Sequence, residues 1–411
     1  MSYFDALTLA AIVDELRATI VDGRIQRVLQ PNTLSLAFEI YAGHRRHHLL
    51  MSAHPRYARI HLSAAKPSRG IQNDTPLLLL LRKYVNGGRI TAIEQPELER
   101  VVLLSIAKRL RPRNLDSDEL DADLETWDED ESGDLLRCEL AVEIMDQRSN
   151  IVLVGDDNVI LNAVRRVTPQ MSRRPIMPRE PYELPPPQEK RDPRHATAAG
   201  VASLLEAQPQ VSPQPTGKAG RAKPATLARA LVAAYRGLSP LAAREAVFRA
   251  TGDGDAMLQA ELPWEQVATA VRAVVSPPWA PMLAEQNGEP LAFAAYALTS
   301  VPGAQAQPSM CAAVDAFYSA RERLTDHQQR RDQLRAELLE TRERLDRQRS
   351  SLAGELERAR DLDRLRWEGE MIFAYIHLVA PRQQELVVED GEGRPHTITL
   401  DPSHSAVENA Q

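Results

Sequence analysis

Residues 77–107, LLLLLRKYVNGGRITAIEQPELERVVLLSIA, contain the pattern of one helix followed by two strands. The apolar run from Leu77 to Val85 predicts a helix that ends at Gly87-Gly88, because glycine is typical of the position after a helix. Two stretches rich in Ile, Val and Leu follow, over residues 89–93 and 100–107, and a short polar segment separates them. A helix next to closely spaced strands predicts an α+β domain.

The first 187 residues continue this pattern and add one further helix. Residues 5–21 place apolar side chains at helical spacing and are followed by Gly23. Further strand-like runs, separated by turn signals, are RIQRVLQ (24–30), LSLAFEIYA (34–42), HHLLMSA (47–53), ARIHLS (58–63), 136–144, 150–154 and 159–164. This order predicts an α+β domain over residues 1–187 with a mostly antiparallel sheet.

One segment of this domain, residues 114–134, is strongly acidic and is expected to be a loop at the tip of a hairpin. Residues 116–134 contain 11 acidic side chains and no basic one, whereas the whole chain has 57 acidic and 50 basic side chains. Without this stretch, 46 acids face 50 bases, and the net charge changes from −7 to +4. A basic body suits an anionic partner, although such a loop is also common as a simple solvated insertion.

The chain changes character after the first domain. Residues 188–224 are rich in Pro, Gln, Gly and Ala and predict a poorly packed linker. Residues 225–300 return to helical patterning and predict a helix-hairpin-helix domain, with Gly237-Leu238-Ser239 as the turn between two helices. Such a turn presents backbone amides and a helix N-terminus to a phosphate, but the same pattern also serves only to pack two helices.

A long charged helix followed by a β-hairpin is expected in residues 310–411. Leucine recurs every seven residues at positions 338, 345 and 352, but polar Thr341 and Gln348 interrupt the alternate seam. This pattern predicts one half of an antiparallel coiled coil, and we expect its return helix to lie outside this sequence. The stretch LVVEDGEGRPHTITL (386–400) predicts the hairpin, with its turn around Asp390-Gly391.

Composition and motifs argue against several classes of protein. No apolar run approaches the length of a membrane span and the N-terminus lacks a basic start, which predicts a cytoplasmic protein. Cys138 and Cys311 lie apart in apolar stretches and are expected to be buried thiols. Four early histidines have no cysteine or carboxylate at ligand spacing, so no metal is expected. Without a phosphate-binding loop or a serine-hydrolase elbow, we expect no cofactor and no catalytic centre.

Basic pairs recur along the first domain and its exit. A guanidinium group contacts phosphate with two hydrogen bonds and stacks on nucleic-acid bases. Any single pair is most simply a solvated surface feature, but the set as a whole favours RNA. The pairs are Arg45-Arg46, Arg82-Lys83, Lys108-Arg109, Arg165-Arg166 and Arg173-Arg174.

Stretches typical of one family occur in a fixed order along nearly the whole chain. In the first domain they are SAHPRYARIHL (52–62), LLRKYVNGGRI (80–90), IEQPELERVV (93–102), EIMDQRSNIVLV (143–154) and PIMPREPYELPPP (175–187). The later ones are GLSPLAAREAVFRATG (237–252), QPSMCAAVDAFYSARE (307–322), GEMIFAYIHLV (369–379) and LDPSHSAVENAQ (400–411). In this combination the chain resembles the NFACT family of ribosome quality-control factors, also called fibronectin-binding protein A-like.

The resemblance implies a factor that recognises a large ribosomal subunit still holding peptidyl-tRNA. It implies recruitment of alanyl-tRNA for untemplated addition of an alanine tail, with peptide transfer done by the ribosome. The implied partners are thus the large ribosomal subunit, alanyl-tRNA and peptidyl-tRNA, and no membrane. A family Asp-Arg pair implied in tRNA binding corresponds to Glu99-Arg100, so the acid is longer by one methylene. From the resemblance we also expect the family's C-terminal RNA-binding domain to lie outside this sequence.

The residues and the resemblance together give a set of candidate RNA contacts. Glu99 and Arg100 are the candidates for tRNA binding. The broader RNA-binding candidates are Arg56, Arg59, Arg82, Lys83, Arg148, Gly237 and Ser239.

Two other functions remain alternatives at this point. The older family name suggests a fibronectin-binding adhesin, although no export signal supports one. A β-rich domain before a helix-hairpin-helix also occurs in DNA glycosylases. Those enzymes use an N-terminal proline and a neighbouring glutamate, which Met1-Ser2-Tyr3 does not supply. Two cysteines also cannot form their four-cysteine zinc finger.

Overall fold

The computed structural model describes residues 4–68, 70, 74–109, 134–206 and 226–411, without the side chains of residues 323–330, 332 and 333. These residues belong to two compact units, Met1–Arg323 and Leu324–Gln411, which are taken one at a time below. The acidic loop expected over residues 114–134 lies outside the described residues except for Asp134. Among the described residues, no helix has the length and apolar character needed to cross a membrane.

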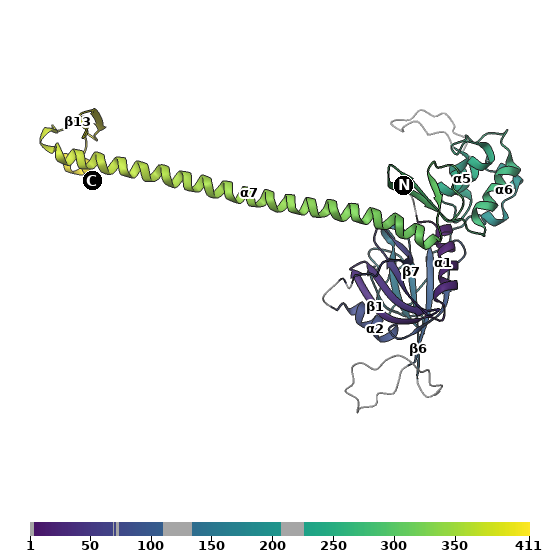
Figure 1. The fold of residues 1–411 in the computed structure, drawn as a ribbon. Coiled ribbons are helices and arrows are strands. Elements are labelled where there is room, and N and C mark those ends of the chain that lie inside the picture. The colour runs from purple at the N-terminus through teal and green to yellow at the C-terminus, as the bar shows by residue number, and fades with distance from the viewer. Residues whose placement is uncertain (1–3, 69, 71–73, 110–133, 207–225) are drawn as a thin grey trace, which may run out of the picture. The chain divides into compact units, whose positions relative to one another are not determined.

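A nine-stranded antiparallel sheet forms the base of the first unit (Figure 1). The strand order is β4-β3-β2-β1-β5-β6-β7-β8-β9, so each strand after β5 pairs with the next one along the chain. In chain order, the strands are β1 (Arg24–Asn32), β2 (Ser35–Ala42), β3 (Arg45–Ser52), β4 (Arg59–Ser63), β5 (Arg89–Glu94), β6 (Val101–Arg109), β7 (Leu135–Glu143), β8 (Asn150–Gly155) and β9 (Ile160–Ala163). This sheet confirms the predicted α+β class.

Two helices, α1 (Ala6–Ile20) and α2 (Pro76–Tyr84), cover one face of the sheet (Figure 1). Asp5 begins α1 as its N-cap, because its carboxylate accepts a hydrogen bond from the Thr8 amide at 2.8 Å. Side chains of α1 such as Leu16 then pack with strand residues such as Ile40 and Leu49, and all three are fully buried. Apolar burial of this kind is the main favourable contribution to folding.

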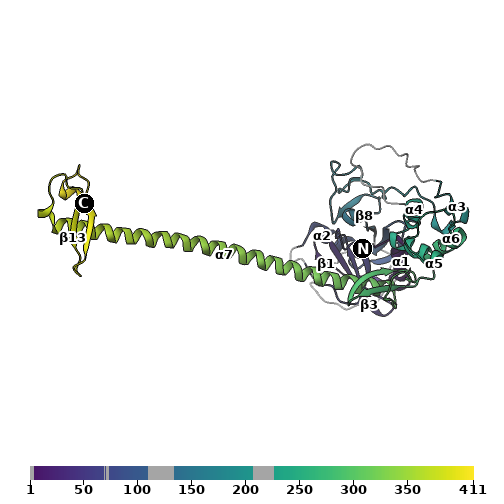
Figure 2. The same ribbon diagram turned by 90° about the horizontal axis from the view of Figure 1, so that it is seen from above.

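A second core lies beside the sheet and gathers the short helices that Figure 2 groups together. Residues 193–202 form part of it, with Val201 fully buried, so the expected linker over residues 188–224 is wrong for residues 188–206. The stretch is anchored because Asp192 binds both Arg194 and Arg236. The helical segments are η2 (Pro193–His195), α3 (Ala198–Ala202), α4 (Leu227–Ala234), α5 (Pro240–Thr251) and α6 (Trp264–Val275).

Residues 282–306 form a small three-stranded sheet, which the helical interpretation of residues 225–300 did not include. Its strands are β10 (Met282–Gln286), β11 (Glu289–Ala294) and β12 (Ala304–Ala306), in the order β11-β10-β12. The missed signal was Asn287-Gly288, because this dipeptide is typical of a two-residue hairpin turn.

The helix α7 (Met310–Ala374) starts against the first unit and continues into the second. Its first turn is held by Glu15 of α1, which accepts hydrogen bonds from the amides of Met310 and Cys311. Further along, the seam leucines 338, 345 and 352 are 70%, 56% and 57% exposed. Among the described residues, no other segment therefore covers this apolar seam, and the half of a coiled coil stays a prediction.

The second unit contains the predicted hairpin, formed by β13 (Glu385–Glu389) and β14 (Pro395–Thr399). Its buried side chains pack with Ile372 near the end of α7. A short η3 (Ile376–Leu378) connects α7 to the hairpin, and α8 (Ala406–Ala410) follows it. Ser405 and Glu408 form a capping box at the start of α8.

Candidate nucleic-acid interface

Arg100 lies immediately before β6, where the backbone of the sheet fixes its position. Its carbonyl accepts a hydrogen bond from the Ile144 amide at 2.8 Å, just beyond the end of β7. Its guanidinium Nη1 lies 3.3 Å from Oδ2 of Asp146, and its side chain is 33% exposed. The exposed pair with Asp146 orients Arg100 and leaves further N–H groups of the guanidinium to bind a ligand.

Glu99 does not share a hydrogen-bond partner with its neighbour Arg100. Its carboxylate oxygens accept hydrogen bonds from the backbone amide and the side-chain amide of Gln188, at 3.1 Å and 3.3 Å. Glu99 therefore tethers the start of the segment that leads to the second core. The acid paired with Arg100 is Asp146, which the sequence argument did not name, although EIMDQRSNIVLV contains it.

The helix-hairpin turn packs directly against the segment that precedes Arg100. Gly237 has a φ of +68°, and a Cβ atom there would lie 2.7 Å from Cβ of Leu98. Two residues later, Ser239 caps α5, because its hydroxyl accepts a hydrogen bond from the Ala242 amide at 3.1 Å. The cap fixes the N-terminal end of α5, which carries the positive end of the helix dipole.

Arg100, Gly237 and Ser239 line one pocket of about 310 Å³. Asp5 forms part of the same pocket, and burial raises the pKa of its carboxyl group, whereas Ser239, Thr8 and Arg100 oppose the shift. A pocket that combines a guanidinium group with the start of a helix suits a phosphate group. Its full lining is Asp5, Ala6, Arg100, Asp146, Gln188, Gly237, Leu238, Ser239 and Pro240.

Comparison with known proteins places this arrangement in a family. The family of NFACT N-terminal and middle domains matches residues 5–411 of the sequence. The chain belongs to the NFACT family. This confirms the resemblance found in the sequence, and it covers both units of the structure.

Curated relatives of this NFACT chain include two bacterial proteins, each named Rqc2 homolog RqcH. The protein from Bacillus subtilis is 29% identical, and one from Streptococcus pneumoniae is 28% identical, each over 99% of this chain. The chain spans only 65% and 64% of the lengths of these relatives.

Solved structures share the fold of this NFACT chain. They include the fibrinogen binding protein from Staphylococcus aureus, with 23% identity and a TM-score of 0.57. The N-terminal part of the fibronectin/fibrinogen-binding protein from Streptococcus suis has 24% identity and a TM-score of 0.56. Each similarity covers 77% of this chain and 99% of the other.

Two further candidates of the NFACT chain lie on exposed surface outside the lining of the Arg100 pocket. Arg148 is exposed on the short 3-10 helix η1 (Asp146–Arg148), which also carries the acid that pairs with Arg100. Arg56 is exposed in the turn before β4. Both stay candidates for RNA contact.

Arg59, in contrast, is buried and holds β4 against the start of α7. Its side chain is 4% exposed and lies 2.7 Å from the Glu322 carboxylate of α7. Its guanidinium carbon also lies 4.9 Å from the centre of the Tyr318 ring. Arg59 is therefore removed from the RNA-binding candidates, because its guanidinium group is buried and already paired with Glu322.

Arg82 and Lys83 lie far from Arg100. Their carbonyl groups accept hydrogen bonds from Nζ of Lys108, at 3.3 Å and 2.8 Å. Lys108 is eight residues along β6 from Arg100, which at ~3.3 Å per residue is roughly 26 Å away. The structure thus brings Arg100 together with Gly237 and Ser239 but not with this basic pair.

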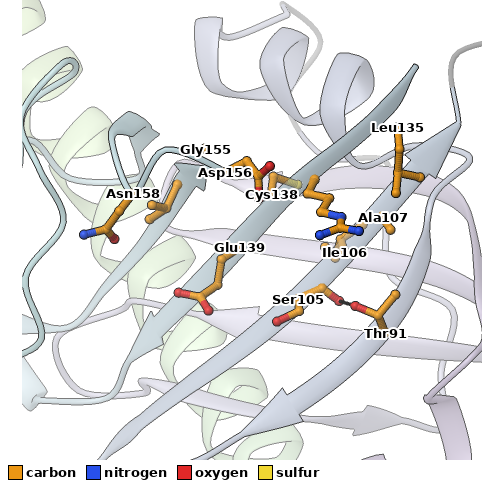
Figure 3. Close-up of a pocket in the computed structure, with 12 residues that line it drawn as sticks. Thr91, Ser105, Ile106, Ala107, Leu135, Cys138, Glu139, Gly155, Asp156 and Asn158 are labelled. Carbon is orange, nitrogen blue, oxygen red and sulfur yellow. Dashed lines mark hydrogen bonds between the residues drawn. The ribbon is translucent and has the colours of Figure 1, made fainter.

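A larger pocket, of about 560 Å³, opens on the exposed face of strands β5 to β8 (Figure 3). Ser105 and Glu139 lie side by side on neighbouring strands there, and Thr91 donates a hydrogen bond to the Ser105 carbonyl at 3.2 Å. Burial, together with Glu94, raises the pKa of Glu139. Its lining includes one guanidinium group and two carboxyl groups, Arg137, Glu139 and Asp156, which is the same balance as in the Arg100 pocket. Unlike the Arg100 pocket, it includes no residue at the start of a helix, so it lacks that feature of a phosphate site.

Proposed function

We propose that this chain is a cytoplasmic ribosome quality-control factor that binds RNA and has no catalytic centre of its own. It binds the obstructed large ribosomal subunit with its peptidyl-tRNA and recruits alanyl-tRNA, so that the ribosome adds an untemplated alanine tail to the stalled chain. Membership of the NFACT family and relatives named Rqc2 homolog RqcH support this proposal.

The observation that carries the proposal is the shared pocket of Arg100 and the helix-hairpin turn. These two features lie more than a hundred residues apart in the sequence, and each has the chemistry of a phosphate contact. Their meeting in one pocket suits a tRNA backbone that crosses from the sheet to the start of α5.

Each residue of the pocket has a separate role in this proposal. Arg100 donates hydrogen bonds to a tRNA phosphate, and Asp146 holds the guanidinium group in place. Ser239 fixes the end of α5, so that the helix dipole faces the same phosphate. Glu99 acts on tRNA indirectly, because it ties residue 188 beside the pocket.

Crosslinking of the protein to RNA in cells, followed by sequencing, tests this function. We expect tRNA and large-subunit RNA to be enriched with the unaltered chain, and tRNA to be lost with Arg100→Ala. Arg244→Ala is the matched control, because Arg244 lies on α5 with a 55% exposed side chain and pairs with Asp255, outside the pocket. Equal tRNA recovery from both variants, or no enriched RNA at all, would overturn the proposal.

A further inference from the structure

A separate basic pocket of about 430 Å³ lies over the first strands of the large sheet. It shares no lining residue with the Arg100 pocket. We call it the β1–β3 pocket. Its lining includes four cations, Arg24, Arg27, Arg46 and Lys66, and one carboxylate, Glu39.

Glu39 is unusual because its carboxylate is buried without a full set of hydrogen bonds. Its side chain is 6% exposed, and Oε2 has no hydrogen-bond partner among the described residues. The nearest cations are at the edge of ion-pair distance, with Arg46 at 3.6 Å and Lys66 at 3.9 Å. Asn86 in the same pocket also has a buried side-chain oxygen without a described partner. Two buried acceptors favour a ligand that brings N–H or O–H donors.

The four cations of the β1–β3 pocket outnumber its one carboxylate, and two of them are available to bind a ligand. Arg24 and Arg27 form no ion pair with any residue in the part of the chain that the structure describes. The pocket therefore carries an excess of positive charge and attracts a ligand with negative groups. A nucleotide with an amino group on its base has both N–H donors and anionic groups.

An exposed aromatic ring extends this pocket along the sheet. Tyr41 is 43% exposed, and its direct cross-strand neighbours are Arg24 on β1 and Arg46 on β3. Glu39 is two residues from Tyr41 on β2, so both side chains point to the same face. Aromatic and arginine side chains that alternate on one face of a sheet are typical of proteins that bind unpaired RNA bases.

We propose that the β1–β3 pocket binds single-stranded RNA through one base that carries an exocyclic amino group. The base stacks on Tyr41 and donates its amino hydrogen to Oε2 of Glu39, as an amino group of cytosine does to a carboxylate in nucleic-acid recognition. The four cations bind the flanking phosphates. This site goes beyond the tRNA pocket at Arg100, because it reads an unpaired base.

Fluorescence anisotropy with labelled RNA hexamers of cytidine or uridine tests the site on the full chain at pH 7.5. Cytosine and uracil have the same shape, but cytosine has an amino group where uracil has a carbonyl oxygen. We expect the cytidine hexamer to bind roughly fivefold tighter, about the effect of one hydrogen bond. Glu39→Gln should reduce the preference for the cytidine hexamer over the uridine hexamer. Tyr41→Ala should weaken the binding of both hexamers by roughly tenfold, because the base loses its stacking partner.

A matched pair of arginine variants separates the pocket from general charge attraction. Arg46 stands opposite Tyr41, whereas its neighbour Arg45 stands opposite Ala42 and belongs to the other face of the sheet. Arg46→Ala should weaken hexamer binding and reduce its salt dependence, and Arg45→Ala should leave both nearly unchanged. Equal losses in the two variants, or equal binding of both hexamers, would overturn the proposal. Arg100→Ala should keep the preference for the cytidine hexamer, because Arg100 lies outside this pocket. The tRNA proposal and the proposal for this pocket can therefore be refuted separately.

Discussion

At the scale of single residues, Gly237 is the position where backbone conformation matters most for the Arg100 pocket. Gly237→Ala should destabilise the chain by about 1–3 kcal/mol, because the residue has a φ of +68° and the new Cβ would lie 2.7 Å from Leu98. Urea unfolding measures this change. Gly252→Ala is the control, since Gly252 has a φ of +79° but nothing within 4 Å of its added Cβ. A loss no larger than that of the control would contradict the importance of the close contact with Leu98.

The sequence predicts some residues of the pocket and misses others for a physical reason. Gly237 and Ser239 follow from the pattern of a turn between two helices, and Arg100 follows from the resemblance. Asp146 could not be paired with Arg100 in advance, because their contact depends on where β7 ends against β6. Arg59 was misassigned because its burial depends on α7, which lies more than 250 residues further along the chain.

At the scale of elements, the contact between β4 and the start of α7 should make stability depend on pH. Nε2 of His61 lies 3.1 Å from Asp315, and burial lowers the pKa of His61 below 6.5. Burial alone would raise the pKa of Asp315, but hydrogen bonds from His61 and the Ala64 amide lower it to about 2. Both groups therefore bind fewer protons in the folded chain than in the unfolded chain, so stability rises with pH.

The two groups act in different pH windows. The contribution of His61 is complete above pH 6.5 and is lost as the pH falls toward the lowered pKa. The contribution of Asp315 is lost only as the pH falls from 3.8 to about 2. Calorimetric Tm values should therefore fall between pH 7.5 and pH 5.5, and they should fall less in His61→Gln. An equal fall in the variant would show that other groups cause the dependence.

Elements with a strong local pattern were predictable, and those that depend on distant partners were not. The strands of the large sheet, α1, the charged helix and the hairpin over residues 386–400 each carry their own periodicity or turn signal. Residues 188–206 carry no such signal, since their larger apolar side chains are only Val201, Leu204 and Leu205. They pack because Val201 and Leu204 reach a core formed by later helices.

At the scale of the whole molecule, the charge distribution should control how fast the chain meets RNA. Residues 116–134 supply 11 of the 57 acidic side chains, and without them the net charge is +4 instead of −7. Replacing this stretch with a neutral Gly-Ser linker of the same length should therefore speed association with tRNA. The gain should shrink with salt, because screening shortens the reach of charges from about 10 Å at 0.1 M to about 3 Å at 1 M.

Stopped-flow association rates at the two salt concentrations measure this effect. A variant with the same residues of 116–134 in permuted order is the matched control, because it keeps the net charge at −7. If the permuted variant associates as slowly as the unaltered chain, long-range repulsion is the cause. If it associates as fast as the neutral variant, a specific order of residues in this stretch inhibits binding, and net charge is not the cause.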